Sequence, residues 1–239
     1  MNKFLLFLIP FVLFSSEFKY LDEPPKYTTM SKYNQIYREM AYLQIYAISA
    51  IGVISILPKS VSNWEKDDDY NSRDLFKKHA DNVAAGPVWD NDNLSINWIG
   101  HGVSGAYYYV WGRQSGLNIP ESFILTTIMS TFYWEYGWEA FAEKPSIQDI
   151  FITPIIGSIL GEITNSAYNT ILENNGLIYG SKTLGTVSRY LINPIGELNK
   201  SFDSLLYKND IELTLDYGYQ DIHSFEIQTY VNFKLQFKY

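Results

Sequence analysis

The sequence predicts a mainly α fold with a C-terminal antiparallel β-hairpin, an α+β class with a helical core of four to five helices. Two observations carry this prediction. Long apolar segments with few charges fill the middle of the chain, and the last thirty residues change to strict two-residue alternation. At 239 residues the chain is long enough for one sizeable core.

The N-terminal residues 1–16 have the pattern of a secretory signal peptide. Lys3 precedes an uncharged apolar stretch that ends at Phe14 and is followed by two serines. An uncleaved anchor is the alternative, because large apolar residues occupy the place where cleavage requires small ones. Residues 17–30 predict an irregular leader, since the Pro24-Pro25 pair blocks a helix.

A helical domain is expected over residues 31–208, beginning with a helix near Ser31. The uncharged part of this helix, 41–58, would rise about 27 Å at roughly 1.5 Å per residue, close to the thickness of a bilayer core. A buried central helix is the alternative. Residues 59–96 are polar and predict a connection with one short helix.

Three helical segments follow, at about 97–112, 118–141 and 146–176, with a weaker helix at 183–191. Asn118 and Glu121 have the spacing of a capping box, and Ser146 can cap the third helix. Pro154 predicts a kink or a restart within that helix.

Residues 209–239 alternate apolar and polar side chains, which predicts a hairpin with one apolar face that turns through residues 220–223. Its last strand resembles the terminal strand of bacterial outer-membrane barrels. Two strands cannot close a barrel. The hairpin is therefore expected to pack on the helices, to pair with another chain as a route to a homo-oligomer, or to be the remnant of a longer barrel.

The composition excludes several classes of function. The chain has 26 acidic and 18 basic residues, a net charge of −8, and no run rich in lysine or arginine, so no nucleic-acid partner is expected. There is no cysteine. Disulfides, thiol nucleophiles and cysteine-bound zinc are therefore excluded.

The apolar segments between residues 97 and 162 carry one histidine and several carboxylates, which are costly in such a setting unless they are paired or used. A histidine beside carboxylates can act as a general base or bind a hard metal ion. The expected catalytic residues are His101, Glu135 and Glu139. If a metal binds, its expected ligands are His101, Glu135, Glu139, Asp149 and Glu162.

Structural explanations compete with these roles. Asp149 can be merely the partner of the Ser146 cap, and His101 can be a satisfied core group. Gly157 and Gly161 have the spacing that lets two helices approach closely. The residues expected to be structural are Asn97, Ser146, Pro154, Gly157 and Gly161.

The central region resembles the bacterial family catalogued as domain of unknown function 3943, over about residues 97–162. Gly102 departs from that family, in which proline follows the histidine. The resemblance implies a protein of the Gram-negative cell envelope, and it carries no activity and no catalytic residues to this chain. The motifs that carry it are Asn97…His101, Gly105-x-Tyr107-Tyr108, Gly112-Arg113-x-x-Gly116, Ser122-Phe123, Ser130-Thr131, Trp134-Glu135-Tyr136-Gly137, Glu139, Glu143-x-Pro145-Ser146-Ile147-Gln148-Asp149, Thr153-Pro154 and Gly157-Ser158-x-x-Gly161-Glu162.

Three hypotheses for function stay open. The leading one is an exported protein of the outer membrane or periplasm, in contact with the outer membrane or envelope lipid, with a binding or structural role. The second is an acid–base or metal-assisted hydrolase of envelope lipid or glycan that uses His101 with Glu135 and Glu139. The third is a polytopic inner-membrane protein.

Overall fold

The computed structural model describes the backbone of residues 31–56, 72–89, 95–141, 143–209, 211–223 and 226–237. Side chains are described for residues 31–49, 76–89, 98–141, 143–206 and 208–209. The expected signal peptide at 1–16 and leader at 17–30 lie outside these residues. The chain divides into two compact units, Met1–Asp68 with Asn199–Tyr239 and Asp69–Leu198. The predicted domain boundaries at residues 30 and 208 stay predictions.

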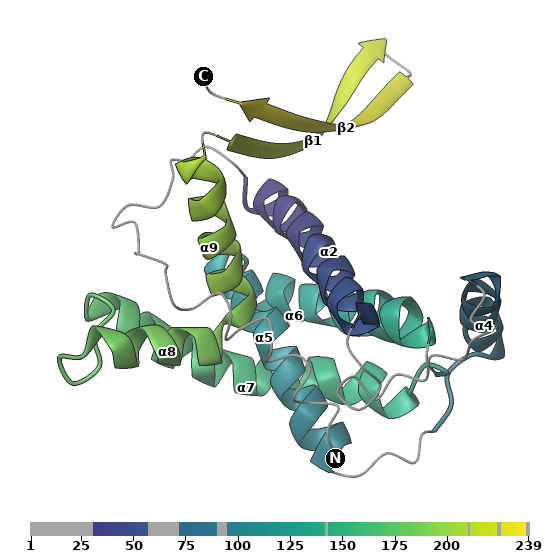
Figure 1. The fold of residues 1–239 in the computed structure, drawn as a ribbon, viewed down its shortest axis with the longest axis horizontal. Helices are drawn as coiled ribbons and strands as arrows, with labels where there is room; N and C mark the ends of the chain where they lie inside the picture. Colours follow the sequence, from purple (N-terminus) through teal and green to yellow (C-terminus); the bar gives the residue numbers. More distant parts are fainter. Residues whose placement is uncertain are drawn as a thin grey trace. The chain divides into compact units, whose positions relative to one another are not determined.

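The second unit is helical (Figure 1). Two helices, α5 (His101–Gln114) and α7 (Ile147–Glu173), lie side by side and share its largest contact, and α6 (Ile119–Ile128) packs against both. The π-helix η2 (Met129–Trp138) and the 3-10 turn η3 (Glu139–Phe141) continue α6. The remaining elements are α4 (Ser72–Ala85), the π-helix η1 (Ser95–Gly100) and α8 (Lys182–Ile192).

Glycines set the distance between α5 and α7. A Cβ atom on Gly105 would lie 2.0 Å from the carbonyl oxygen of Thr153, and one on Gly157 would lie 2.5 Å from the Cα of Gly105. A Cβ on Gly161 would lie 2.8 Å from the Cβ of Tyr109. The two helices therefore touch through their main chains, an approach that only glycine permits.

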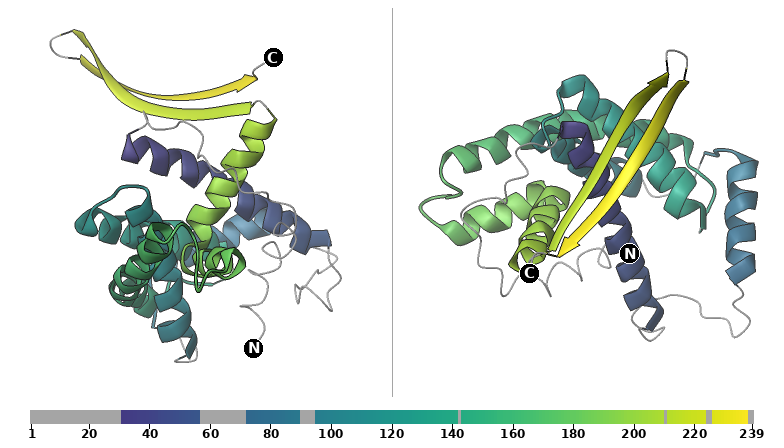
Figure 2. Two further views of the ribbon diagram at one scale, coloured as in Figure 1. Left: turned by 90° about the vertical axis from the view of Figure 1, so that its left-hand side faces the viewer. Right: turned by 90° about the horizontal axis from the view of Figure 1, so that it is seen from above.

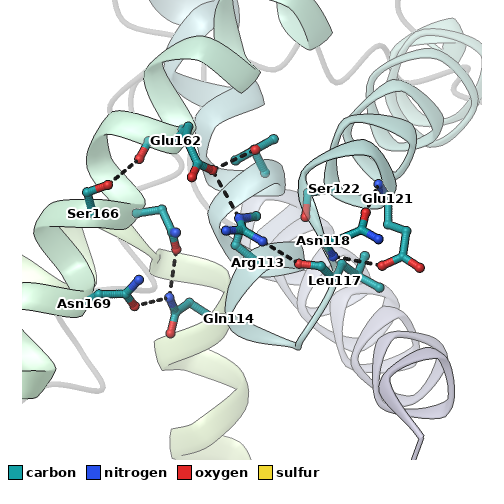
Figure 3. Close-up of polar contacts among 12 residues, drawn as sticks. Arg113, Gln114, Leu117, Asn118, Glu121, Ser122, Glu162, Ser166 and Asn169 are labelled. Carbon is teal, nitrogen blue, oxygen red and sulfur yellow. Dashed lines mark hydrogen bonds and ion pairs between the residues drawn. The ribbon is translucent and has the colours of Figure 1, made fainter.

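Capping residues fix where the helices of this unit begin. The Asn118 side chain accepts from the backbone N–H of Glu121, whose carboxylate accepts from the Asn118 N–H, so the predicted capping box is confirmed (Figure 3). Ser146 caps α7 by accepting from the N–H of Asp149. The helix α7 continues through Pro154, where a kink or restart was expected.

The first unit contains α2 (Lys32–Ile56) and the larger part of α9 (Pro194–Lys208), a helix that the sequence patterns did not predict. The start of α2 confirms the helix expected near Ser31. In this unit the Arg38 guanidinium donates to the Asp203 carboxylate at 3.0 Å, and the Tyr42 hydroxyl donates to the same group at 2.7 Å. All three side chains are buried.

The predicted fold class, α+β with four to five helices, is wrong. The chain is mainly helical, with seven α-helices in its described part, and none of the residues with described side chains lies in a β-strand. Beyond them, the backbone of β1 (Ile211–His223) pairs antiparallel with β2 (Glu226–Phe237), shown in Figure 2. The side chains of these strands lie outside the described residues, so the strands do not support an α+β class.

Candidate functional site

Three of the residues singled out in the sequence meet in the second unit. His101, Glu135 and Asp149 each offer a ligand atom, and these atoms all lie within 4.8 Å of one another. Glu135 and Asp149 are buried, with exposed fractions of 1% and 4%, and the His101 side chain is 15% exposed. We call these three residues the His101 cluster.

Each member of the His101 cluster comes from a different element. His101 is the first residue of α5, directly after the π-helix η1; Glu135 lies within the π-helix η2; and Asp149 lies in the first turn of α7. Short π-helical segments are rare and occur often at functional sites, because the extra residue turns the following side chains away from their α-helical direction. Both described π-helices of this unit adjoin or contain a member of the cluster.

The His101 ring is held from both sides. Its Nε2 lies 3.4 Å from the Asp149 Oδ2, and its Nδ1 lies 3.3 Å from the hydroxyl of Thr153, one turn along α7. A hydroxyl at Nδ1 can fix the orientation and tautomer of the ring and leave Nε2 directed at the carboxylates.

Ser146 connects the Glu135 carboxylate to the main chain of Asp149. Its backbone N–H donates to the Glu135 Oε2 at 2.7 Å, and its hydroxyl accepts from the Asp149 N–H at 3.2 Å. The hydroxyl of Ser130 donates to the backbone oxygen of Asp149 at 3.2 Å. The first of these bonds orients the Glu135 carboxylate, and the other two fix the backbone from which the Asp149 side chain projects.

Helix α4 supports the end of η2 that follows Glu135. The His79 Nε2 lies 3.1 Å from the backbone oxygens of both Tyr136 and Gly137, and the Asn82 side chain donates to the backbone oxygen of Ala140 at 2.9 Å. The backbone between Glu135 and Glu139 is therefore held by side chains from a separate helix.

Glu139 adds a fourth ionisable group beside the cluster. Burial raises the pKa of Glu139 well above its ordinary value, and the neighbouring carboxylates of Glu135, Glu143 and Asp149 and a hydrogen bond with Glu135 raise it further. Burial also raises the pKa of Tyr108, with smaller contributions from Tyr133 and Glu139. These shifts reflect negative charge gathered in a buried place.

Glu162 lies apart from the cluster. Its carboxylate accepts from the Tyr109 hydroxyl at 2.7 Å and from the Arg113 guanidinium at 3.1 Å, and Arg113 also donates to the backbone oxygen of Leu117 (Figure 3). Burial, followed by the hydrogen bond and charge of Glu162, raises the pKa of Tyr109 to about 12. Of the five expected metal ligands, the geometry brings three together, places Glu139 beside them and separates Glu162.

Asn97 lies in η1, and its side chain lies outside the described residues. Asp149 combines the two roles that the sequence left open, because its N–H completes the Ser146 cap while its carboxylate lies against His101. The sequence patterns did not assign a role to Thr153. Its position four residues after Asp149 places both on one helix face, and that spacing is the signal for its contact with His101.

The donor set suits a divalent cation. One imidazole nitrogen and two carboxylates are donors for zinc, manganese or iron, and three protein ligands leave positions for water or substrate in catalytic sites. The buried carboxylates also fit a cation electrostatically, because a cation would lower the cost of their ionisation.

No curated protein and no solved structure matches the chain. Residues 86–195 match the model of a family described as "Domain of unknown function (DUF3943)". This span contains the whole His101 cluster together with Glu139, Thr153 and Ser146. The resemblance seen over residues 97–162 is therefore confirmed, and the span that matches this family model extends beyond it at both ends.

Proposed function

We propose that this protein binds a divalent metal ion at His101, Glu135 and Asp149 and acts as a metal-assisted hydrolase of the cell envelope. The observation that supports the proposal is the convergence of three ligand atoms from three helices within 4.8 Å. A metal ion bound there would polarise a carbonyl or phosphoryl oxygen and lower the pKa of a water molecule.

The residues of the chain have distinct parts in this proposal. His101, through Nε2, and Asp149 bind the ion together with Glu135, and Thr153 and Ser146 hold these ligands in place. Glu139 lies beside Glu135, and its raised pKa keeps it protonated in the metal-free fold. It would receive a proton from an attacking water once a bound cation lowers that pKa. Because Glu135 and Asp149 are buried, their carboxylates are shielded from bulk water.

The envelope assignment rests on the N-terminal pattern of a signal peptide and on what the resemblance implies. Export to the periplasm or the outer membrane remains part of the proposal. A purely structural or binding role without metal is the competing function, and metal binding by the purified chain separates the two.

The test is calorimetric titration of the chelator-treated, full-length protein with Zn²⁺, Mn²⁺ and Mg²⁺ in turn. We expect one ion per chain in the wild type. Binding should be at least about 100-fold weaker in Asp149→Asn, because losing a metal ligand lowers the affinity at least as much as losing a residue that orients a ligand. The matched control is Glu162→Gln, which removes a carboxylate from the same unit outside the cluster and should keep wild-type affinity.

Hydrolysis is measured separately with the chromogenic probes p-nitrophenyl acetate and bis(p-nitrophenyl) phosphate, with and without the bound ion. Metal-dependent turnover that is lost in Asp149→Asn and kept in Glu162→Gln supports the proposal. A wild type that takes up no ion, or an Asp149→Asn variant with unchanged affinity, overturns it.

A further inference from the structure

One face of α7 exposes a row of large apolar side chains. Phe151, Ile155, Ile159 and Ile163 recur every four residues and have exposed fractions of 60%, 47%, 61% and 65%. This spacing puts them on one side of the helix. We call these four residues the α7 apolar row.

The buried side of α7 has the opposite character. Its buried residues are mostly polar or small: Asp149, Thr153, Pro154, Gly157, Gly161, Asn165, Tyr168 and Ile171. Helix α6 shows a similar pattern: two of its three buried residues, Ser122 and Thr126, are polar and the third is Leu125. Ile119, Phe123, Ile124 and Ile128 are exposed. In a water-exposed helix the apolar side faces inward. Helices that pack through small and polar residues and turn apolar residues outward are typical of contact with lipid.

The apolar surfaces of the two helices meet at a hollow of about 420 Å³. Ile119 and Phe123 line it from α6 and Ile159 lines it from α7, with the Tyr109–Glu162 pair at its polar edge. Its volume falls within the range of about 300–1,000 Å³ that is usual for small-molecule sites. A lining this apolar suits a hydrocarbon chain.

Charge also favours hydrocarbon over a polar partner. There is no charged residue from Ser122 to Trp134 or from Ile150 to Gly161. Glu162, paired with Arg113 and Tyr109, lies at one edge of the face. The long charge-free stretches leave most of its border without the polar residues that surround the apolar centre of most protein–protein interfaces.

The exposed apolar side chains also lie next to the His101 cluster in the sequence. Trp98 and Ile99 precede His101, Phe132 precedes Glu135 by three residues, and Phe151 follows Asp149 by two; each is more than half exposed. A substrate reaching the cluster past these side chains would be flanked by apolar groups.

Within the described residues, α7 is the one helix long and apolar enough to cross a membrane by length and composition. The α7 apolar row itself, from Phe151 to Ile163, covers about 18 Å at roughly 1.5 Å per residue, less than a hydrocarbon core of about 30 Å. The row is therefore long enough for one leaflet and does not require a crossing.

We infer that the α6–α7 face, centred on the α7 apolar row, lies among the acyl chains of one leaflet of a lipid bilayer. The inference of lipid contact rests on the properties of this surface and not on the proposed function. Its extension, that the hydrolysed substrate is a lipid drawn from that leaflet, rests on the proposed function.

The absence of cysteine makes a direct test possible, since a single introduced cysteine is the only thiol in the chain. The full-length variants Ile159→Cys and Val187→Cys, each labelled with a polarity-sensitive fluorophore, are mixed with vesicles of phosphatidylcholine and phosphatidylethanolamine in chelator. Val187 is a matched control, because it is a half-exposed apolar residue on α8 of the same unit. The emission of the Ile159 label should shift to shorter wavelength, and lipids brominated in the acyl chain should quench it; the Val187 label should show neither change.

A pair of charge variants tests the same surface without labels. Ile155→Glu with Ile159→Glu should weaken co-sedimentation with these vesicles at least about tenfold. Val187→Glu with Leu191→Glu should leave it unchanged, and circular dichroism verifies that both variants are folded. If the wild type fails to sediment, if the Ile159 label does not respond, or if both pairs weaken binding equally, the lipid contact is refuted; cover by another part of the chain or by a second copy predicts the first two results.

The two proposals fail separately. Asp149→Asn should lose the metal ion and keep vesicle binding. A wild type that binds the ion and hydrolyses the soluble probes but ignores vesicles refutes the lipid contact, and the lipid substrate with it, and leaves the hydrolase proposal standing. A protein that binds vesicles but no ion refutes the hydrolase alone.

Discussion

The buried carboxyl groups of the two units have different partners. In the first unit, Asp203 has the Arg38 guanidinium and the Tyr42 hydroxyl as partners. In the second, the carboxyl groups of Glu135, Glu139 and Asp149 gather around a single imidazole. A buried carboxylate paired with arginine forms a unit of balanced charge. The carboxyl groups of Glu135 and Asp149 beside one histidine, with a protonated Glu139 next to them, are the setting in which the proposed cation would offset negative charge.

Other carboxylates of the second unit follow the first pattern. Glu197 lies 3.8 Å from the Arg189 guanidinium and accepts a hydrogen bond from the Tyr168 hydroxyl, and Glu162 accepts from Arg113 and Tyr109. An arginine and a tyrosine thus recur as partners where a buried or half-buried carboxylate has a structural role. In the His101 cluster, by contrast, the carboxylates of Glu135 and Asp149 lie beside an imidazole.

The largest effect is expected from Glu139→Gln, which removes one acid from the crowded site. The raised pKa keeps Glu139 neutral in the fold at pH 7, whereas it ionises in the unfolded chain. The contribution of Glu139 to stability is therefore complete below about pH 4.5. It is lost as the pH rises above this value, because the carboxyl group then ionises in the unfolded chain while it stays neutral in the fold. At pH 7 the metal-free variant should be more stable than the wild type by up to about 3 kcal/mol, because glutamine mimics the neutral acid.

Urea unfolding at pH 7 and pH 4 measures this difference, and the gain should disappear at pH 4. Glu162→Gln is the control and should change the free energy of unfolding by no more than about 1 kcal/mol. A Glu139→Gln variant less stable than the wild type at pH 7 would mean that the crowded site is compensated in the same way as Asp203.

The next effect concerns the pH dependence of the Asp203 site. Burial raises the pKa of Asp203 to about 6, although Arg38 and Tyr42 lower it. Because this folded-state pKa lies above the unfolded value, the contribution of Asp203 to stability is complete below about pH 4 and is lost as the pH rises through 6. Relative to Asp203→Asn, the free energy of unfolding of the wild type should therefore fall by about 2–3 kcal/mol between pH 4 and pH 8. A difference that stays constant across this range would refute the assignment.

The smallest effect tests the arginine itself. Arg38→Met removes a cation that lowers the pKa of Asp203, so this pKa should rise further and the loss of stability should extend to higher pH. We expect Arg38→Met to cost about 1–2 kcal/mol more at pH 8 than at pH 5. Arg113→Met is the matched control: its ion pair with Glu162 is partly exposed, and its effect should stay within about 1 kcal/mol at both values.

The sequence predicted well those features that depend on neighbouring residues. The Asn118–Glu121 capping box and the Ser146 cap are local hydrogen bonds with a fixed spacing, so helix starts could be placed within a residue or two. The helix α9 was missed because Pro194 and Gly196 resemble a loop. Its signal was Asn193 before proline, since the Asn193 side chain accepts from the N–H of Gly196 in the manner of a helix cap.

The site could be predicted only in part. Helix periodicity placed His101, Glu135 and Asp149 on faces that can meet, but it assumed 3.6 residues per turn. The π-helices η1 and η2 break that period, so the directions of the side chains within and next to them, Glu135 and Glu139 among them, could not be calculated from spacing. Glu162 follows Asp149 by 13 residues on α7, so its separation from the cluster did follow from spacing. Helix register across α5 and α7 depends on contacts between distant residues, which one sequence does not contain.

The main-chain contact between Gly105 and Gly157 has a consequence for the proposed metal site. Gly105 follows His101 by four residues and Gly157 follows Asp149 by eight, so the contact lies one turn from the donor on α5 and two turns from the donor on α7. This contact sets the distance between the backbones that carry His101 and Asp149, whatever rotamers their side chains adopt. If an ion binds there as proposed, a methyl group added at Gly105 or Gly157 should change which ion fits by moving the two helices apart.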